Sequence, residues 1–472
     1  MKLILKNKQT LFLVSLFVLG VLARVFVFLK NQSLWVDESM LAINFLTLPY
    51  KGLLKGLEYM QASPAGYNLV NKFLLETFKT NNVYFRDMEL RLIPFISSIL
   101  SLPAFLILLK SLLKDRVKIL YGFSLLAVNP LAILYAGQCK QYSTELLISI
   151  ILFYCFYKIS TEKEFRWYYL LIIPISVWFS YSAFFIIAAG MITLLVSKKF
   201  KEFLYLFAIL LFSNVIYYFI SLKSVFSVNY NGMDNFWSQS YAFMELRHPT
   251  RLFIRFGELF IRLKSFSIFV GLISFYALIK YSFNKSNPLA PKLLFCITIF
   301  GIIFASALHK YPIYARLILF TLPIFIIAIT DLKGKTGVIL KSATVLISGF
   351  ALTNYTIHAK EMAYSYARDI VPYVIENVSQ RDTIIIDTRP EYDLYLLGTN
   401  LNNTIIENKI QCIEKNINKC EAFIETLPKG SYYYLSGSYY VKDFIKNNKY
   451  EIKELNIKHK ANKTKALYFI KK

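Results

Sequence analysis

The chain contains 472 residues, of which 56% are hydrophobic and 17% aromatic, and its mean hydropathy is +0.46. A soluble protein of this length has a lower apolar fraction and shorter apolar runs, so the composition argues against a soluble class. The net charge of +25 invites a nucleic-acid partner, but many Lys and Arg residues lie in short loops between apolar runs. At such positions they set membrane topology and contact anionic lipid headgroups, so no nucleic acid is expected as a partner.

Repeated apolar runs of about 17–22 residues predict transmembrane helices, because a bilayer admits only helices and closed barrels and these runs lack the alternation of a barrel strand. The expected fold class is an α-helical polytopic membrane protein with about eleven transmembrane helices and a small C-terminal α/β domain. The expected spans are residues 10–29, 91–109, 119–136, 144–158, 203–221, 265–281, 293–308, 313–330 and 337–354, with 167–196 forming a two-helix hairpin that turns near residues 180–182.

The distribution of positive charge predicts the orientation. Lys2, Lys6 and Lys8 precede the first run and should remain cytoplasmic. That run leads into charged and aromatic residues rather than a small-residue cleavage site, so it is expected to stay as an anchor. Alternating spans then place long loops, about 31–90 and 222–264, outside the cytoplasm. The transmembrane domain is expected at 1–356, and a soluble extracytoplasmic domain at 357–472.

Beyond residue 357 polar residues become frequent and apolar runs shorten to strand length. Strands are expected at 383–387, 432–435 and 466–470, with helical patterns such as 441–446 between them, which predicts an α/β domain. Cys412 and Cys420 fall in this domain, where a disulfide is allowed. One straight helix would hold their Cα atoms about 12 Å apart, so a bond requires a turn near residues 416–418. No Cys/His spacing resembles a zinc site.

Two adjacent carboxylates, Asp37 and Glu38, follow Trp35 just beyond the first apolar run. One interpretation is a solvated pair that caps a following helix at 39–45, where negative charge is favoured. The other is chemistry at the outer surface. There a carboxylate takes a proton from an acceptor hydroxyl or amine, or binds a divalent cation that neutralises phosphate.

A polar segment at residues 138–145 lies at the expected outer mouth of two helices. Four of its side chains recur at three- and four-residue spacing and so share one helical face: Gln138, Gln141, Tyr142 and Glu145. Such a face usually lines a cavity, and Lys140 beside it is suited to a phosphate group. The alternative is a set of ordinary interfacial residues.

Two arginines mark the outer ends of other helices. Arg316 begins an apolar run, and Arg91 starts the second span. Each arginine has two interpretations: it binds phosphate oxygens through two N–H donors, or it anchors its helix by snorkelling. The outer loop from Asp234 through Trp237 and His248 is rich in aromatic and charged residues. It has the composition of a lid over a sugar, and equally of an interfacial loop.

In combination these segments resemble a known family. Leu34–Glu38 resembles the Trp-x-Asp-Glu signature of bacterial polytopic glycosyltransferases of the C superfamily, which includes protein O-mannosyltransferases (family 39) and aminoarabinose transferases. Further stretches that resemble the family are 62–67 in the same outer loop, 89–94 at the second helix, 129–143 at the third helix exit and 315–323 at a late helix entry.

The resemblance implies a multi-pass protein of the bacterial cytoplasmic membrane whose donor is a sugar on a polyprenyl phosphate. It implies Asp37 as the catalytic base or acceptor-organising group, with a second acidic residue at Glu145 or Asp234. Some relatives use a divalent metal, for which Glu58 and His248 are the candidate ligands here.

The first functional hypothesis is therefore a membrane glycosyltransferase. Asp37 and Glu38 would act on the acceptor; Lys140, Arg316, Tyr142 and Arg91 would bind the donor phosphate; and Trp35, Gln141, Glu145 and Trp237 would contact the acceptor or cover the site. The alternative is a transporter or flippase of lipid-linked saccharides, which typically shows midplane charges, repeated halves and broken helices. The charges singled out here lie at helix ends and no internal repeat is present. A structural assembly subunit is the third possibility.

Overall fold

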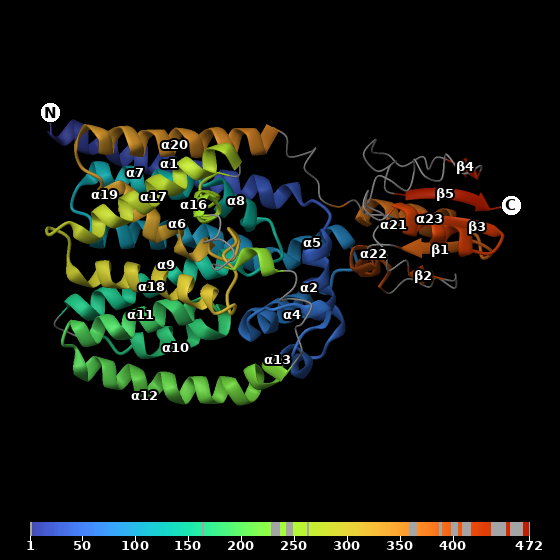
Figure 1. Cartoon of the computed structure of the whole chain (residues 1–472), viewed down its shortest axis with the longest axis horizontal. Coiled ribbons are helices and arrows are strands. Elements are labelled where there is room, and N and C mark those ends of the chain that lie inside the picture. The colour runs from blue at the N-terminus through green and yellow to red at the C-terminus, as the bar shows by residue number, and fades with distance from the viewer. Residues whose placement is uncertain are drawn as a thin grey trace. The chain divides into compact units, whose positions relative to one another are not determined.

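The computed structural model describes residues 2–162, 165–227, 237–241, 249–261, 264–357, 365, 367–386, 389–397, 405–407, 417–435, 450–453 and 466–471. These residues form two compact units (Figure 1). The first unit contains residues 1–30, 48–78 and 88–359. The second unit contains 31–47, 79–87 and 360–472, so parts of the predicted first outer loop belong with the tail.

The first unit is helical. Its helices are α1 (Lys2–Lys30), α3 (Tyr50–Leu53), η1 (Glu58–Met60), α4 (Ala65–Phe78), α6 (Leu92–Leu112), α7 (Arg116–Ala127), α8 (Pro130–Ala136), α9 (Tyr142–Thr161), α10 (Tyr169–Phe179), α11 (Ala183–Val196), α12 (Phe200–Tyr217), the π-helical η2 (Tyr218–Leu222), α13 (Lys223–Ser227), η3 (Ser238–Ser240), α16 (Pro249–Gly257), α17 (Lys264–Phe283), α18 (Leu289–Ala307), η4 (Leu319–Thr321), α19 (Leu322–Asp331) and α20 (Gly334–Ile357).

The chain is a multi-pass helical membrane protein. Within the described ranges, seven helices are long and apolar enough to cross a membrane: Lys8–Lys30, Leu92–Leu112, Tyr142–Thr161, Phe200–Val225, Phe266–Phe283, Leu289–Ala307 and Gly334–Thr353. The pair α7 and α8 makes an eighth if it is counted as one span, and three shorter apolar helices are α10, α11 and the segment Leu319–Asp331. The break between α10 and α11 falls at residues 180–182, where the sequence predicts a turn.

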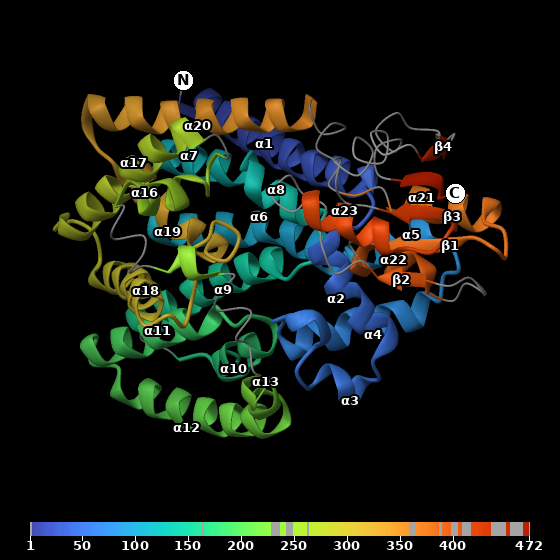
Figure 2. The ribbon, with the colours of Figure 1, turned by 45° about the vertical axis from the view of Figure 1, so that its right-hand side comes forward.

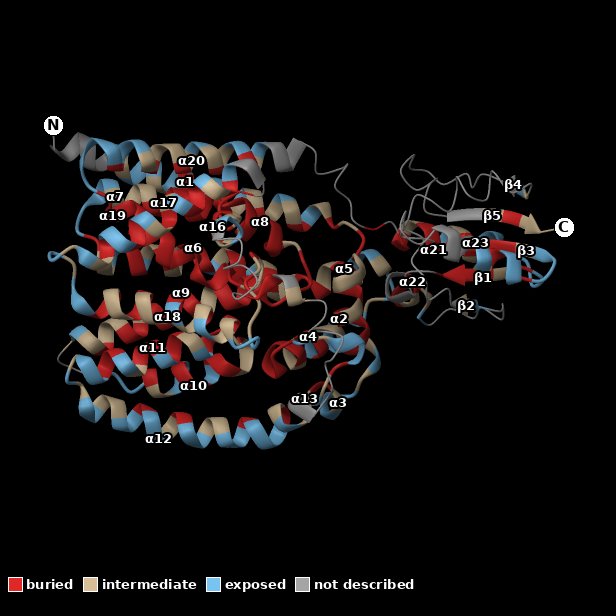
Figure 3. Cartoon of the chain, in the orientation of Figure 1, coloured by how far each residue is buried: buried red, intermediate tan, exposed pale blue. Residues whose placement is uncertain are grey.

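Burial separates central from peripheral helices. The span in α9 has 56% of its residues buried within the protein, against 17% for Phe200–Val225. α6 and α9 lie in the middle of this unit, α1 with α20 lies along one side, and α12 lies along the other (Figure 2). Many residues of α12 and α20 are exposed (Figure 3). Since most of these exposed residues are apolar, the outer helices present the surface that lipid would cover.

The third span is not the single helix that the sequence suggests over 119–136. It is bent by 47° between α7 and α8. Pro130 lacks the N–H that would continue the helix, and the Asn129 side chain instead caps α8 by accepting from the Ala132 N–H at 2.8 Å. The expectation of a span at 313–330 is also wrong in extent. Regular helix begins only at η4 and α19, because residues 312–314 have no regular structure and residues 315–318 form a turn.

The second unit holds a five-stranded sheet. Its elements are α2 (Val36–Thr47), most of α5 (Val83–Leu90), α21 (Ala367–Asn377), β1 (Thr383–Ile386), α22 (Arg389–Leu396), β2 (Ile405–Glu407), α23 (Ile417–Thr426), β3 (Gly430–Leu435), β4 (Glu451–Lys453) and β5 (Ala466–Lys471). The strand order is β2-β1-β3-β5-β4. β1 runs parallel to β2 and β3, whereas β5 is antiparallel to β3 and β4.

The three strands predicted from the sequence are confirmed as β1, β3 and β5. Their inward side chains pack into a small core around Ile385, Tyr432 and Phe469, with the two rings stacked at 5.2 Å. The sequence missed β2 and β4, which are three-residue edge strands and too short to show alternation. The helical pattern at 441–446 and the proposed Cys412–Cys420 bond involve residues outside the described ranges.

Candidate functional site

The paired carboxylates lie in the first turn of α2, in the second unit. Glu38 is buried, and its Oε2 accepts a hydrogen bond from the Trp35 backbone N–H at 3.5 Å. This contact is long, but a carboxylate in a first helical turn also gains from the helix dipole. Asp37 and Trp35 are half-buried. Glu38 therefore takes part in starting the helix, while Asp37 keeps access to solvent.

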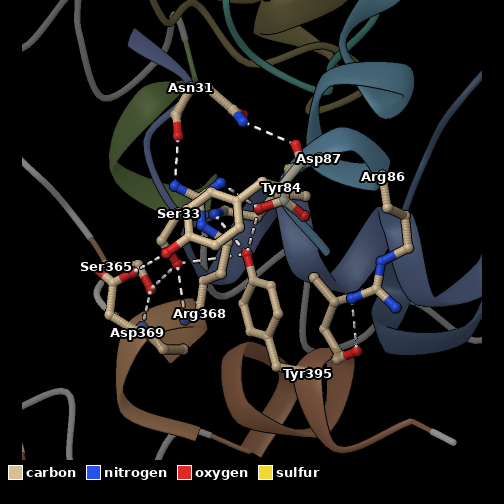
Figure 4. Close-up of polar contacts among 12 residues, drawn as sticks. Asn31, Ser33, Tyr84, Arg86, Asp87, Ser365, Arg368, Asp369 and Tyr395 are labelled. Atoms are coloured by element: carbon tan, nitrogen blue, oxygen red, sulfur yellow. Dashed lines mark hydrogen bonds and ion pairs between the residues drawn. The ribbon is translucent and has the colours of Figure 1, made fainter. Parts of the chain in front are cut away.

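The segment that leads into α2 is held by a buried ion pair (Figure 4). Arg368 Nη1 donates to Asp87 Oδ2 at 2.9 Å, and the side chains are 7% and 0% exposed. The Tyr395 hydroxyl donates to the same carboxylate oxygen at 2.8 Å and accepts from the Leu34 N–H at 3.0 Å. Burial, together with the Asp87 charge, raises the pKa of Tyr395 well above its usual value, so the phenol stays a donor.

Further bonds extend this network to both sides. Arg368 Nη2 donates to the Asn31 carbonyl at 2.6 Å, and its guanidinium lies 4.2 Å from the centre of the Tyr84 ring. The Arg368 N–H donates to Ser33 Oγ at 3.2 Å, and Tyr84 donates to Asp369 at 3.0 Å. The Asn31 side chain also donates to the Tyr84 carbonyl of α5 at 2.8 Å. Residues 31–34, just before the carboxylates, are thus bonded to α21, α22 and α5 (Figure 4).

A second polar group lies in the first unit, where the α8–α9 connection meets the segment before α4. Lys140 is buried, and its Nζ donates to Gln61 Oε1 at 2.7 Å. Gln141 Nε2 donates to the Ala62 carbonyl at 3.2 Å. The Tyr181 hydroxyl donates to the Ser63 carbonyl at 3.1 Å. Three stretches far apart in sequence are therefore joined at the predicted outer end of the bundle.

Buried acceptors concentrate in these same stretches. Within the described residues, oxygens that are buried without a hydrogen-bond partner include Ser63 Oγ, Asn68 Oδ1, Asn71 Oδ1, Gln138 Oε1, Gln141 Oε1 and Ser143 Oγ. Leaving such a group unpaired costs about 1–3 kcal/mol. Groups of this kind are typical of a site whose ligand or waters supply the missing donors.

Glu145 and Tyr142 belong to the first turn of α9, and both are buried. No hydrogen bond to the Glu145 carboxylate comes from the part of the chain that the structure describes. The nearby Tyr311 hydroxyl donates to the Leu317 carbonyl at 2.7 Å. Desolvation, and then the charges of Glu145 and Tyr142, raise the pKa of Tyr311 well above its usual value. The segment that carries Tyr311 leads into η4, which packs against α9.

Arg316 lies on an aromatic platform. Its guanidinium carbon is 5.5 Å from the ring centres of both Trp237 and Tyr314, and these two rings meet edge to face at 5.6 Å. Arg255 approaches the Tyr314 ring at 4.7 Å and forms a 3.3 Å ion pair with Glu258. Aromatic contacts favour Arg over Lys at such a position. The platform gathers two guanidinium groups around one phenol ring.

The remaining predicted residues are more scattered. Arg91 is buried at the N-terminus of α6. Glu58 is exposed in η1, whereas His248 and Asp234 lie outside the described residues. In the described ranges no group of three His, Cys, Asp or Glu side chains is arranged to hold a metal ion. Lys140, Gln141, Tyr142 and Glu145 are neighbours in the first unit, while the Trp35–Glu38 segment belongs to the second.

Sequence reasoning missed several polar residues of this architecture. Asp87 and Arg368 are 281 positions apart, and neither stands in a recognisable motif. Arg24 is fully buried within the first span, although the expected charges lay at helix ends. An arginine inside an apolar run was the one available signal, because such a charge must find partners within the protein.

The fold defines the class of this protein as a multi-pass membrane protein with a small sheet-containing unit. Comparison with solved structures shows which known fold it resembles. The crystal structure of ArnT from Cupriavidus metallidurans in the apo state superposes with a TM-score of 0.54 at 11% identity, and covers 97% of each chain. The crystal structure of that protein bound to undecaprenyl phosphate gives 0.57 at 10% identity and the same coverage. The chain therefore has the ArnT fold, which confirms the resemblance to aminoarabinose transferases at the level of the fold.

No family model matches the chain, and no curated protein matches it by sequence.

Proposed function

We propose that this protein is a membrane glycosyltransferase that moves a sugar from a polyprenyl-phosphate donor to an extracytoplasmic glycan, lipid or protein. The observation that carries the proposal is the ArnT fold along the whole chain, since one of the matched ArnT structures binds undecaprenyl phosphate. The buried polar group around Lys140 and the arginine platform at Arg316 support it, because they offer cations and unpaired acceptors in the same helical unit. Fold alone does not set chemistry, so each of these residues needs a test of its own.

The proposed setting is the bacterial cytoplasmic membrane, with the N-terminus in the cytoplasm. Eight candidate spans, counting the bent pair, and three shorter apolar helices are compatible with about eleven crossings. An odd number of crossings places the tail outside. The proposed division is a transmembrane domain at 1–356 and an extracytoplasmic α/β domain at 357–472.

In the proposed reaction the acceptor hydroxyl or amine attacks the anomeric carbon as Asp37 takes its proton. The bond from the anomeric carbon to the phosphate oxygen breaks, and the polyprenyl phosphate leaves with that electron pair, so the configuration inverts. Glu38, in the first turn of α2, orients the acceptor. Lys140 and Arg316, assisted by Tyr142 and Arg91, offset the phosphate charge.

The other proposed contacts concern the acceptor. Trp35, Gln141, Glu145 and Trp237 are assigned to acceptor binding or to covering the site. A divalent metal held by Glu58 and His248 stays a hypothesis, and no step above depends on it.

Transfer is tested directly with the purified protein in lipid vesicles that contain a polyprenyl-phosphate sugar. We expect release of free polyprenyl phosphate to require an acceptor and to keep pace with glycosylated product. If the lipid-linked sugar instead moves unchanged from one leaflet of the vesicle membrane to the other, the protein is a flippase. The bend between α7 and α8 is the observation that favours this alternative, because broken helices are common in transporters.

Replacing Arg316 by Lys tests the phosphate assignment. Lys keeps the charge but loses the forked donors and the flat contact with Trp237 and Tyr314. We expect the KM for the donor to rise roughly tenfold, as when one hydrogen bond to a charged group is lost. The KM for the acceptor should hardly change. The control is Arg166→Lys, at an exposed arginine that contacts Tyr168. Unchanged donor dependence in Arg316→Lys removes Arg316 from the site.

Cysteine labelling tests the orientation, in a background without the five native cysteines. Cysteine at the exposed Asn81 should react in intact cells with a reagent that does not cross the membrane, whereas cysteine at the exposed Thr161 should not. Both positions should react after the membrane is permeabilised. The reverse pattern overturns the proposed topology and the placement of the acidic loop.

A further inference from the structure

Arg24 is a permanent charge buried within the first span. It is 0% exposed and lies inside the apolar stretch Lys8–Lys30. Each of its partners is neutral: Nη1 donates to the Gly20 and Ala127 carbonyls at 2.8 and 3.1 Å, Nη2 to the Leu126 carbonyl at 3.3 Å, and Nε to Ser98 at 2.8 Å (Oγ) and 3.1 Å (carbonyl). A guanidinium spread over five acceptors is well solvated by the protein, although no carboxylate is among these partners.

Two of these partners are the last carbonyls of α7, where the third span breaks. In a continuous helix the Leu126 carbonyl would accept from the N–H of residue 130, but residue 130 is proline. The Leu126 carbonyl accepts instead from the Asn129 N–H at 3.3 Å, and Arg24 adds a further donor from the neighbouring helix. A cation at this point also faces the negative end of the α7 dipole. Arg24 therefore stabilises the break itself.

The same side chain reaches α8 through Ser98. Ser98 Oγ accepts from Arg24 Nε at 2.8 Å and donates to the Ala132 carbonyl of α8 at 3.1 Å. One turn further along α1, Val27 lies against the end of α8. A Cβ added to Gly137 would stand only 2.6 Å from Val27 Cγ1. α1 thus contacts both sides of the break and Gly137, the residue that follows α8.

The α8 helix is only seven residues long and leads directly into the connection that carries Lys140. Its direction fixes where that connection begins. We propose that Arg24 is a positioning residue, which holds the α7–α8 bend through the Leu126 and Ala127 carbonyls and Ser98 and so places Lys140 in the donor site. The proposal rests on the proposed function only for the identity of that donor. Its geometric part, that Arg24 holds the α8–α9 connection in place, does not depend on the reaction.

The geometric part is tested by the reactivity of Cys139, a buried thiol beside Lys140. With the other four cysteines replaced, we expect a small maleimide to label Cys139 on the order of tenfold faster in Arg24→Met and Ser98→Ala, because the connection opens more often. Arg24→Lys should lie between these variants and the wild type. Leu16→Ala, also buried on α1, is the control for a general loss of packing and should label like the wild type.

Ser98→Ala and Arg24→Lys keep the test decisive if Arg24→Met fails to fold, since both leave a cation in α1. Wild-type labelling rates in these variants overturn the positioning role. The positioning role is also overturned if Leu16→Ala labels as fast as Ser98→Ala and Arg24→Lys at the same loss of thermal stability.

Donor kinetics test the link to Lys140. Arg24→Lys should raise the KM for the polyprenyl-phosphate sugar more than it lowers kcat. In a Lys140→Met background the same change should have little further effect, since coupled residues are not additive. Additive effects contradict the link. If the protein transfers no sugar at all, the proposed function fails, while Cys139 labelling still decides whether Arg24 holds the connection.

Discussion

Replacement of Asp37 by Asn is expected to lower the turnover of sugar transfer by a factor of about 10²–10⁴, the usual contribution of a positioned general base. Asn keeps the size of the side chain and its place in the first turn of α2, but it cannot take the acceptor proton. The KM for the lipid donor should stay close to its wild-type value, because Asp37 is assigned to the acceptor. Single-turnover kinetics with a polyprenyl-phosphate sugar measure this step.

Two further carboxyl-to-amide changes separate chemistry from folding. Glu376→Gln changes an exposed carboxylate on α21 in the same unit and should leave turnover unchanged. Glu38→Gln removes a buried charge at the start of α2 and should cost about 0.5–2 kcal/mol of local stability, with a smaller effect on rate. An Asp37→Asn enzyme that turns over at the rate of Glu376→Gln would falsify the role of Asp37 as the base.

Replacement of Asp87 by Asn should cause the largest loss of stability. It leaves Arg368 buried without its carboxylate and weakens the hydrogen bond from Tyr395. Removing one partner of a buried ion pair costs about 3–5 kcal/mol. Because Arg368 and Tyr395 hold residues 31–34, we expect faster amide hydrogen exchange at 31–39 and 367–377, measured on the full chain in detergent or vesicles.

The matched control is Asp369→Asn, on the next residue of α21. Asp369 accepts one hydrogen bond from Tyr84 and is half-buried, so its loss should cost only about 1 kcal/mol. Asp87→Asn/Arg368→Met, which removes both charges, should exchange more slowly than Asp87→Asn alone. Wild-type exchange in Asp87→Asn would show that this ion pair does not hold the loop.

The loop contacts also connect the two predictions. Asp37 follows directly on a segment whose carbonyls and amides are bonded to Arg368 and Tyr395. Loosening that segment through Asp87→Asn should therefore lower turnover as well, though less than Asp37→Asn does. Turnover should be partly restored in Asp87→Asn/Arg368→Met. No such recovery is expected if Asp87→Asn acts on the chemistry of Asp37 itself.

The membrane character and the main strands were determined by the sequence alone. Length and hydropathy identify a span without reference to partners, because each helix satisfies its own backbone in lipid. β1, β3 and β5 were predictable for a similar reason, since each is a continuous apolar run. The acidic start of α2 was also visible, as Asp37 and Glu38 follow directly on an apolar stretch.

Only the tertiary structure decided what depends on distant partners. The break at Asn129-Pro130 could be suspected from the proline, but the side-chain donors that reach its carbonyls come from Arg24, about a hundred residues away. Likewise, the sequence shows Asp87 and Arg368 as ordinary surface charges, and only folding brings them within 2.9 Å. Hydrophobic periodicity reports how one helix meets its surroundings. It carries no information about which buried polar groups pair across the fold, and those pairs support the candidate site.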